Sequence, residues 1–325
     1  MGSSDRGTTV TTQALAALAA LVLIVAGCGT SASPSPTPAA TAAPASPSPS
    51  AAAEASPSAS QSPVDGRFLG DIEVADGRHL HMACAGSGSP TVILDSGFGT
   101  GIEGWSRVFS QVAELTHVCA YERAGIGGSS PVDGTKTTGD IVDDLRELVA
   151  TAGIPTPYIL VGHSIAGLHL RLMGGLHADE LAGLVFVDVS VPDQFEAWLA
   201  ALPPATPDDP AWLTDLRADL GAGWPPAELA ERYDILAGLD DVRAVTSFGD
   251  LPIVVLTAGL QTIAPAGDPL GMRLQDVWFD LHEALTSMSS NGRHELVPAA
   301  RHSIQDDVPD AVIEAIRDLV ERARG

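Results

Sequence analysis

The stretch from Tyr158 to Arg171 limits the possible folds of this chain more than any other. It begins with a short apolar run, Tyr158–Val161, which is typical of a buried parallel strand. It ends with leucines at 168, 170 and 172, a pattern that suits a buried helix. Between them, residues 162–167 read Gly-His-Ser-Ile-Ala-Gly. The sequence therefore predicts a strand that turns directly into a helix, with Ser164 at the turn.

A turn of this kind makes the serine hydroxyl accessible to a reacting molecule. The small residues Gly162 and Ala166 let the strand and helix backbones approach each other, and the sharp turn lifts the Ser164 side chain clear. Unpaired N–H groups at the helix start point to the space above the serine, where an anion could bind. The pattern matches a Gly-x-Ser-x-Gly nucleophile elbow, except that Ala166 replaces the second glycine. We therefore expect a nucleophile at Ser164 rather than an incidental glycine–serine turn.

Residues 1–27 have the features of an export signal. The apolar run Ala14–Ala26 is too short to span a bilayer comfortably and has the length of a signal-peptide core. It leads into Val-Ala-Gly-Cys at 25–28, which resembles the lipobox of bacterial lipoproteins and implies cleavage before Cys28 and lipidation of its thiol. The alternative is an ordinary secretory signal with a coincidental cysteine. Residues 28–63 are mostly Ser, Pro, Ala and Thr, so we predict a disordered tether there.

The expected location is therefore outside the cytoplasm, either lipid-anchored to the bacterial cell membrane or secreted. Stable anchoring requires the several acyl chains of a processed lipoprotein. The formal net charge of −24, with only 17 lysines and arginines, argues against nucleic acid or an anionic lipid surface as a partner. The oligomeric state is left open.

Residues 64–325 are predicted to form one α/β domain with a mostly parallel sheet, because strand and helix patterns alternate along them. Asp76-Gly77 between two strand-like runs predicts a hairpin. The alternation stops at about 191–250, a segment rich in Pro, Trp and Leu that is predicted to form a cap of short helices.

The chain resembles the α/β-hydrolase superfamily. The resemblance rests on the elbow, on residues 121–129 (Tyr-Glu-Arg-Ala-Gly-Ile-Gly-Gly-Ser, similar to the family's YDRxGxGxS), on Arg301-His302-Ser303 and on the position of the cap. It implies an eight-stranded, mostly parallel sheet in the order 1-2-4-3-5-6-7-8, with helices on both faces and a cap inserted after strand six. The fold alone does not identify a substrate, because it hosts many chemistries.

The resemblance also implies a catalytic histidine after the last strand, and His302 occupies that place. A serine hydroxyl needs such a base, which a carboxylate orients in turn. His163 and His169 are poorer candidates, since the first belongs to the elbow and the second to the following helix. A surface histidine is the alternative interpretation of His302.

The carboxylate is harder to identify. The usual family site follows strand seven in the form G-x-x-D, but Thr262 stands at the aspartate position here. Some members take the acid from the end of strand six, which favours Asp188. Asp268 is the second choice, and Asp193 remains open.

The oxyanion hole is expected to use the backbone N–H groups of Ile165, directly after the nucleophile, and of Phe98, in the glycine-rich loop after strand three. A phosphate-binding loop is the alternative for residues 96–99, but no lysine follows it.

The implied strand order makes strands two and four neighbours, which predicts a disulfide between Cys84 and Cys119; two free buried thiols are the alternative. Five aromatic residues could line an acyl pocket beneath the cap, namely Trp105, Phe109, Trp198, Trp212 and Trp224. Ordinary core packing is the other explanation for each of them. No Cys/His spacing indicates a metal site, and no cofactor is expected.

The predicted function is a serine hydrolase that cleaves a carboxylic ester in a small molecule through an acyl-enzyme on Ser164. One alternative is a peptidase or amidase that uses the same triad, similar to proline iminopeptidases. Another is a non-catalytic binding lipoprotein that kept the fold. A dehalogenase is not expected, because the dehalogenases of this superfamily carry an aspartate where this chain has Ser164.

Overall fold

The computed structural model describes residues 66–225, 231–260, 263–265 and 267–325. The predicted signal peptide at 1–27, the lipidation site Cys28, the tether at 28–63 and Thr262 lie outside the described residues.

Eight strands in the described residues form one sheet in the order β1-β2-β4-β3-β5-β6-β7-β8. The strands are β1 (Phe68–Glu73), β2 (His79–Ala85), β3 (Val92–Asp95), β4 (Val118–Tyr121), β5 (Tyr158–His163), β6 (Leu181–Val187), β7 (Ile253–Ala258) and β8 (Gly292–Val297). β2 pairs antiparallel with β1 and β4, and the remaining pairs are parallel. This is the predicted α/β-hydrolase fold with the predicted strand order.

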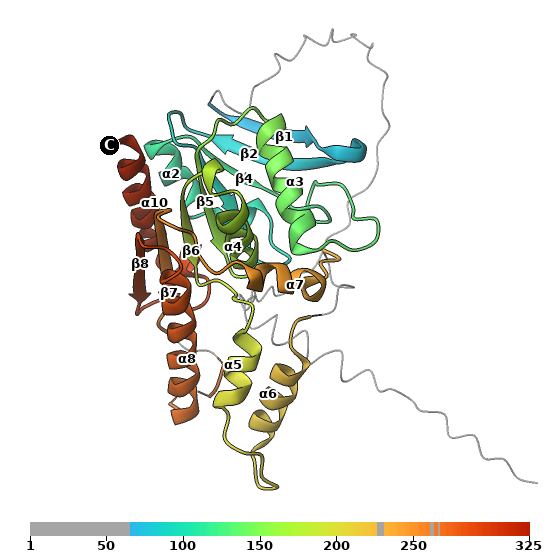
Figure 1. Ribbon diagram of the computed structural model, residues 1–325, viewed down its shortest axis with the longest axis vertical. Helices are drawn as coiled ribbons and strands as arrows, with labels where there is room; N and C mark the ends of the chain where they lie inside the picture. The colour runs from blue at the N-terminus through green and yellow to red at the C-terminus, as the bar shows by residue number, and fades with distance from the viewer. Residues whose placement is uncertain (1–65, 226–230, 261–262, 266) are drawn as a thin grey trace, which may run out of the picture.

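Helices cover both faces of the sheet and one of its ends (Figure 1). The α-helices are α2 (Phe109–Leu115), α3 (Thr138–Thr151), α4 (Ala166–Leu176), α5 (Gln194–Ala201), α6 (Ala211–Ala222), α7 (Ile235–Ala244), α8 (Pro269–Thr286), α9 (Ile304–Asp307) and α10 (Pro309–Arg324). Short 3-10 helices are η1 (Ala75–Gly77), η2 (Ile102–Trp105) and η3 (Ala178–Glu180).

The core consists of two apolar layers, one on each face of the sheet. Alternate residues of a strand point to opposite faces. In β5, Leu160 joins the layer formed with α3 and α4, whereas Ile159 and Val161 join the layer formed with α2 and α10. Because both faces are covered, the central strands are apolar throughout, as the sequence of β5 already indicated.

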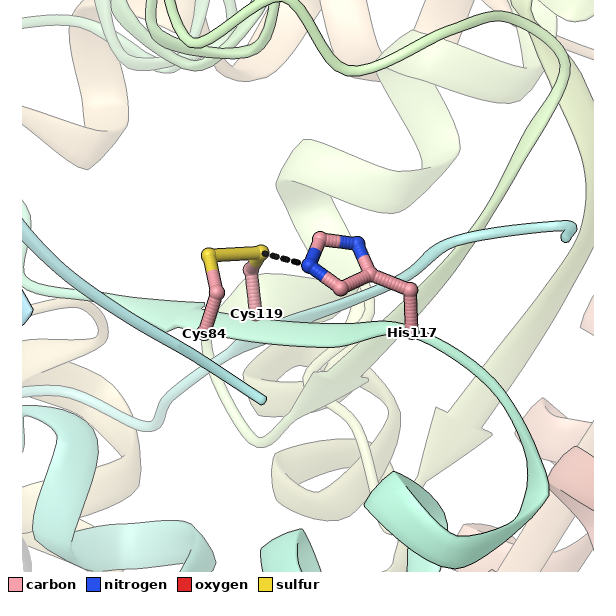
Figure 2. Close-up of side chains that lie close together, drawn as sticks. All are labelled: Cys84, His117 and Cys119. Carbon is pink, nitrogen blue, oxygen red and sulfur yellow. Dashed lines mark hydrogen bonds between the residues drawn. A yellow bond between two sulfur atoms is a disulfide. The ribbon is translucent and has the colours of Figure 1, made fainter. Parts of the chain in front are cut away.

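The hairpin between β1 and β2 turns at Asp76-Gly77, as predicted. Both residues have positive φ, 61° and 71°, which Asp and Gly tolerate better than other residues. β2 continues the sheet toward β4 and places Cys84 directly opposite Cys119. The two sulfurs form the expected disulfide, and the His117 ring lies beside it (Figure 2).

The segment between β6 and β7 contains α5, α6 and α7. α5 and α6 extend beyond the end of the sheet next to α8 (Figure 1), and these three helices share an apolar cluster that includes Trp198, Leu216 and Leu274. α7 packs instead on α3 and α4. No helix among the described residues is long and apolar enough to cross a membrane.

Candidate active site

Ser164 lies in the turn between β5 and α4. Its φ of 55° is in the left-handed region, which a serine adopts only when its surroundings hold it there. The neighbouring Gly162 explains why small residues flank the serine, because a Cβ at this position would lie 2.6 Å from Leu170 Cδ1 and 2.9 Å from Ala166 Cβ. The predicted turn geometry is therefore present, with the strand and helix in close contact.

Three side chains from distant parts of the chain form a linear hydrogen-bonded series. His302 follows β8, and its Nε2 lies 2.9 Å from Ser164 Oγ. Its Nδ1 lies 2.7 Å from Oδ2 of Asp188, the first residue after β6. This is the arrangement by which a carboxylate orients an imidazole toward a serine.

The other two candidate carboxylates have different partners. Asp268 caps the N-terminus of α8, where its Oδ1 accepts a hydrogen bond from the Leu270 N–H at 2.8 Å. Asp193 forms an ion pair at the surface with Arg243, at 2.7 Å. Among the candidates that the structure describes, only Asp188 contacts His302.

Two N–H groups hold the second oxygen of Asp188. Its Oδ1 accepts hydrogen bonds from the Ala258 backbone at 2.9 Å and from the Trp278 indole at 2.8 Å. Burial alone would raise the pKa of the Asp188 carboxyl, but the hydrogen bond and positive field of His302, with the Ala258 N–H, lower it below its usual value. Asp188 is therefore ionised at neutral pH.

The remaining histidines near the turn have structural partners. His163 donates from Nε2 to the His302 carbonyl oxygen at 3.1 Å, which supports the loop that carries His302. Burial and the nearby His302 charge lower the pKa of His163 to about 3. His169 is fully buried, and its Nδ1 lies 2.8 Å from Asp95 Oδ2. Neither contacts Ser164 Oγ.

Phe98 and Ile165 both line the cavity next to Ser164. In the part of the chain that the structure describes, neither backbone N–H has a protein acceptor. The space between Gly97 and the turn at residues 163–164 is narrow, because a Cβ on Gly97 would lie 2.8 Å from His163 Nδ1 and 3.4 Å from Ser164 Cβ. Two backbone donors without an acceptor among the described residues thus belong to the lining of the cavity that contains Ser164.

A cavity of about 240 Å³ opens beside Ser164 and His302 and is lined mainly by apolar side chains. Trp198 and Trp224, two of the five aromatic candidates for a pocket, line it together with Phe195 and Trp278, which were not among the candidates. Trp278 stacks on Trp198 with ring centroids 4.9 Å apart. Its position one helical turn after Leu274, on the apolar side of α8, was the available sequence signal.

For three of the five aromatic residues the structure shows core packing, the other explanation, instead of a pocket role. Trp105 and Phe109 pack in the layer that faces α10, on the other side of the sheet from α4. Trp212 packs against the apolar cluster shared by α5, α6 and α8 and does not line the cavity. Apolar patterning predicts that an aromatic residue is buried, but it does not identify the apolar layer that buries it.

One group of described side chains has the composition of a metal site. Donor atoms of Cys84, His117 and Cys119 lie within 4.8 Å of one another (Figure 2). Because the two sulfurs are bonded to each other, they are not available as thiolate ligands.

Comparisons with known proteins agree with this fold. The sequence profile of the alpha/beta hydrolase family matches residues 92–315. The uncharacterized protein YqjL of Bacillus subtilis (strain 168) is 24% identical over 237 residues, covering 72% of this chain and 85% of that protein. A probable transporter, efuK, of Hormonema carpetanum is 35% identical over 107 residues, but these are 32% of this chain and only 15% of that protein.

Two solved structures share the fold at low sequence identity. An esterase from Thermogutta terrifontis has a TM-score of 0.55 and 18% identity, covering 79% of this chain and 100% of that chain. A putative lipase from Acinetobacter baumannii AYE has a TM-score of 0.59 and 17% identity, covering 80% and 92%. With the family profile spanning most of the folded domain, the chain belongs to the alpha/beta hydrolase family.

Proposed function

We propose that this protein is a serine hydrolase that cleaves carboxylic esters with an apolar acyl group. The observation that carries the proposal is the series Ser164–His302–Asp188, with Oγ to Nε2 at 2.9 Å and Nδ1 to Oδ2 at 2.7 Å. The esterase and lipase among the similar structures support an ester substrate, and the aromatic lining of the cavity supports an apolar acyl group.

The proposed reaction has two halves. In the first, Ser164 Oγ attacks the ester carbonyl while His302 Nε2 takes its proton, and the resulting oxyanion accepts hydrogen bonds from the Phe98 and Ile165 N–H groups. The C–O bond to the alcohol then breaks, and His302 gives the proton to the departing alkoxide. In the second half, His302 deprotonates a water that attacks the acyl-enzyme, and the carboxylic acid leaves as Ser164 regains its proton.

The test is hydrolysis of p-nitrophenyl esters from acetate to decanoate, with the matching p-nitroanilides as amide substrates. We expect ester cleavage that disappears in Ser164→Ala and persists in Ser110→Ala, which removes an exposed hydroxyl on α2. Faster cleavage of the anilides would favour the amidase alternative. A folded wild-type protein that cleaves neither series would favour a non-catalytic binding role.

We further propose that the protein is exported and anchored to the cell membrane through a lipid on Cys28. The lipobox-like residues 25–28 support this proposal, and so does the Cys84–Cys119 disulfide, since disulfides persist mainly in oxidising compartments. Wild-type protein should partition with membranes and Cys28→Ala should not. Equal partitioning of the two would contradict the proposal.

A further inference from the structure

A cluster of buried charges lies behind the glycine-rich loop, outside the triad. The Arg123 guanidinium is flanked by Asp95 at 2.7 Å and Glu231 at 2.6 Å, and these three side chains are at most 4% exposed. Arg123 belongs to the motif after β4, whereas Glu231 comes from the segment between α6 and α7. Buried charges are costly unless fully paired, so a cluster of this kind needs a physical reason.

We propose that Arg123 and Glu231 are positioning residues for the oxyanion hole: they hold the Gly97–Phe98 peptide so that the Phe98 N–H faces Ser164. The inference rests on the proposed serine-hydrolase function. It concerns how the hole is built, and neither residue contacts the triad.

The guanidinium contacts the loop backbone directly. Arg123 Nη1 donates to the Ser96 carbonyl oxygen at 2.6 Å, and Nη2 donates to that of Gly97 at 2.8 Å. The other donors bind carboxylates, with Nη1 to Asp95 Oδ1 at 2.7 Å and Nε to Glu231 Oε2 at 2.6 Å. Arg123 thus uses its planar set of donors to bind two consecutive carbonyls and two acids.

The orientation of the Phe98 N–H follows from peptide geometry. The C=O of Gly97 and the N–H of Phe98 belong to one planar trans peptide, so they point in opposite directions. A carbonyl held toward Arg123 therefore directs the Phe98 N–H away from Arg123. The Phe98 N–H has no protein acceptor among the described residues, and Phe98 lines the cavity beside Ser164.

Glu231 fixes the same loop on the other side of Phe98. Its Oε1 accepts the Gly99 N–H at 2.6 Å and also a hydrogen bond from Arg123 Nη2 at 2.7 Å. The peptides before and after Phe98 are thereby held by one ion pair. Burial alone would lower the pKa of Arg123, but the Glu231 and Asp95 charges raise it well above its usual value, so Arg123 keeps its positive charge.

The decisive variant is Arg123→Lys, which keeps the charge but cannot bind two carbonyls and two acids at once. Glu231→Gln is the second variant and is used if Arg123→Lys fails to fold. Glutamine has nearly the same size as glutamate. Arg171→Lys is the matched control, since Arg171 is a partly buried arginine that donates to the Val245 carbonyl, away from the loop.

Three measurements are made on each folded variant. They are kcat and KM for p-nitrophenyl butyrate, the affinity for butylboronic acid, and the hydrogen exchange rates of the amides at 97–101. A boronic acid forms a tetrahedral anion on the serine and so reports on the oxyanion hole. For Arg123→Lys we expect kcat and boronate affinity to fall about 10- to 100-fold with KM within about twofold, because the donor is misaligned rather than removed. Exchange at 97–101 should accelerate, and Arg171→Lys should change none of the three.

A folded Arg123→Lys with unchanged kcat, boronate affinity and exchange would overturn the inference, and so would a rise in KM at constant kcat. If Arg123→Lys does not fold, Glu231→Gln decides by the same criteria. The exchange measurement requires no turnover. An inactive wild-type protein would therefore refute the proposed hydrolysis, while exchange at Gly99, whose N–H binds Glu231, would still decide whether the ion pair holds the loop.

Discussion

Replacement of Asp188 by asparagine tests the proposed triad by changing which ring nitrogen of His302 carries the proton. The Ala258 and Trp278 N–H groups both point at Oδ1, so an asparagine at 188 must place its carbonyl oxygen there. Its NH2 group then faces His302 Nδ1 and donates to it. This forces the imidazole proton onto Nε2, where it points at Ser164 Oγ, and His302 can no longer act as the base.

The magnitude follows from this wrong tautomer. Misplacing the proton in a serine–histidine–aspartate triad lowers kcat about ten-thousand-fold, which is about 5.5 kcal/mol in the activation free energy. Folding should be little affected, because asparagine keeps the size of the side chain and the two hydrogen bonds to its oxygen.

Asp268→Asn is the matched control, since asparagine caps a helix as well as aspartate does. The assay is kcat for a p-nitrophenyl ester, with thermal unfolding as the folding check. We expect Asp268→Asn to keep kcat within about twofold of the wild type, because the cap is retained. If Asp188→Asn kept more than about a tenth of wild-type kcat, the derivation from the tautomer would be wrong.

Three further predictions concern His163, Trp278 and the disulfide. The pKa of His163 is lowered to about 3 in the folded protein, so as the pH falls the unfolded chain protonates this histidine first. The contribution of His163 to the free energy of unfolding is therefore fully present above about pH 6.5 and is lost as the pH drops toward 3. Urea unfolding between pH 7 and pH 4 should therefore give His163→Gln a shallower acid loss, by up to about 1.4 kcal/mol per pH unit, and parallel curves would contradict this. Trp278→Phe removes one hydrogen-bond donor to Asp188 and should lower kcat about tenfold. Trp105→Phe is the control and should leave kcat unchanged, because the Trp105 indole nitrogen has no partner among the described residues. Equal effects of the two substitutions on kcat would exclude a role for the Trp278 hydrogen bond. The double variant Cys84→Ala, Cys119→Ala opens a loop with a sequence separation of 35 and should lose about 3–4 kcal/mol of unfolding free energy; alkylation of the native protein without reduction would argue against the disulfide.

The fold and the strand–turn–helix at Ser164 could be predicted because their signals are local. The apolar run 158–161, the small residues around Ser164 and the helix after it all lie within a few residues of one another. His302 could be placed by its position between the last strand and the last helix. The strand order, which came from the family resemblance, then placed Cys84 beside Cys119.

The family resemblance favoured Asp188 among the carboxylates, but the sequence could not exclude Asp268 or Asp193, because the partner of a carboxylate is set by tertiary contacts. All three lie near strand ends or in loops of the cap side. Only the pairing of β6 with β7 brings Asp188 against Ala258, and only the packing of α8 brings the Trp278 indole to its second oxygen.

The Arg123–Glu231 pair escaped the sequence analysis for the same reason. The two residues are 108 positions apart, and Glu231 lies in the cap segment, where the strand–helix alternation had stopped. The available signal was Arg123 itself, a charged residue directly after an apolar strand and within a motif of small residues. Such an arginine is more plausibly an anchor for backbone carbonyls than a surface charge, because a buried guanidinium must satisfy its five donors.

Labelling with a fluorophosphonate probe tests the central claim most directly, because the probe reacts only with a serine whose proton a neighbouring base removes. We expect one adduct on the wild-type protein, mapped by peptide mass to Ser164, with none in Ser164→Ala and greatly slowed labelling in folded His302→Ala. A folded wild-type protein that takes up no probe, or that carries the adduct on another serine, would contradict it.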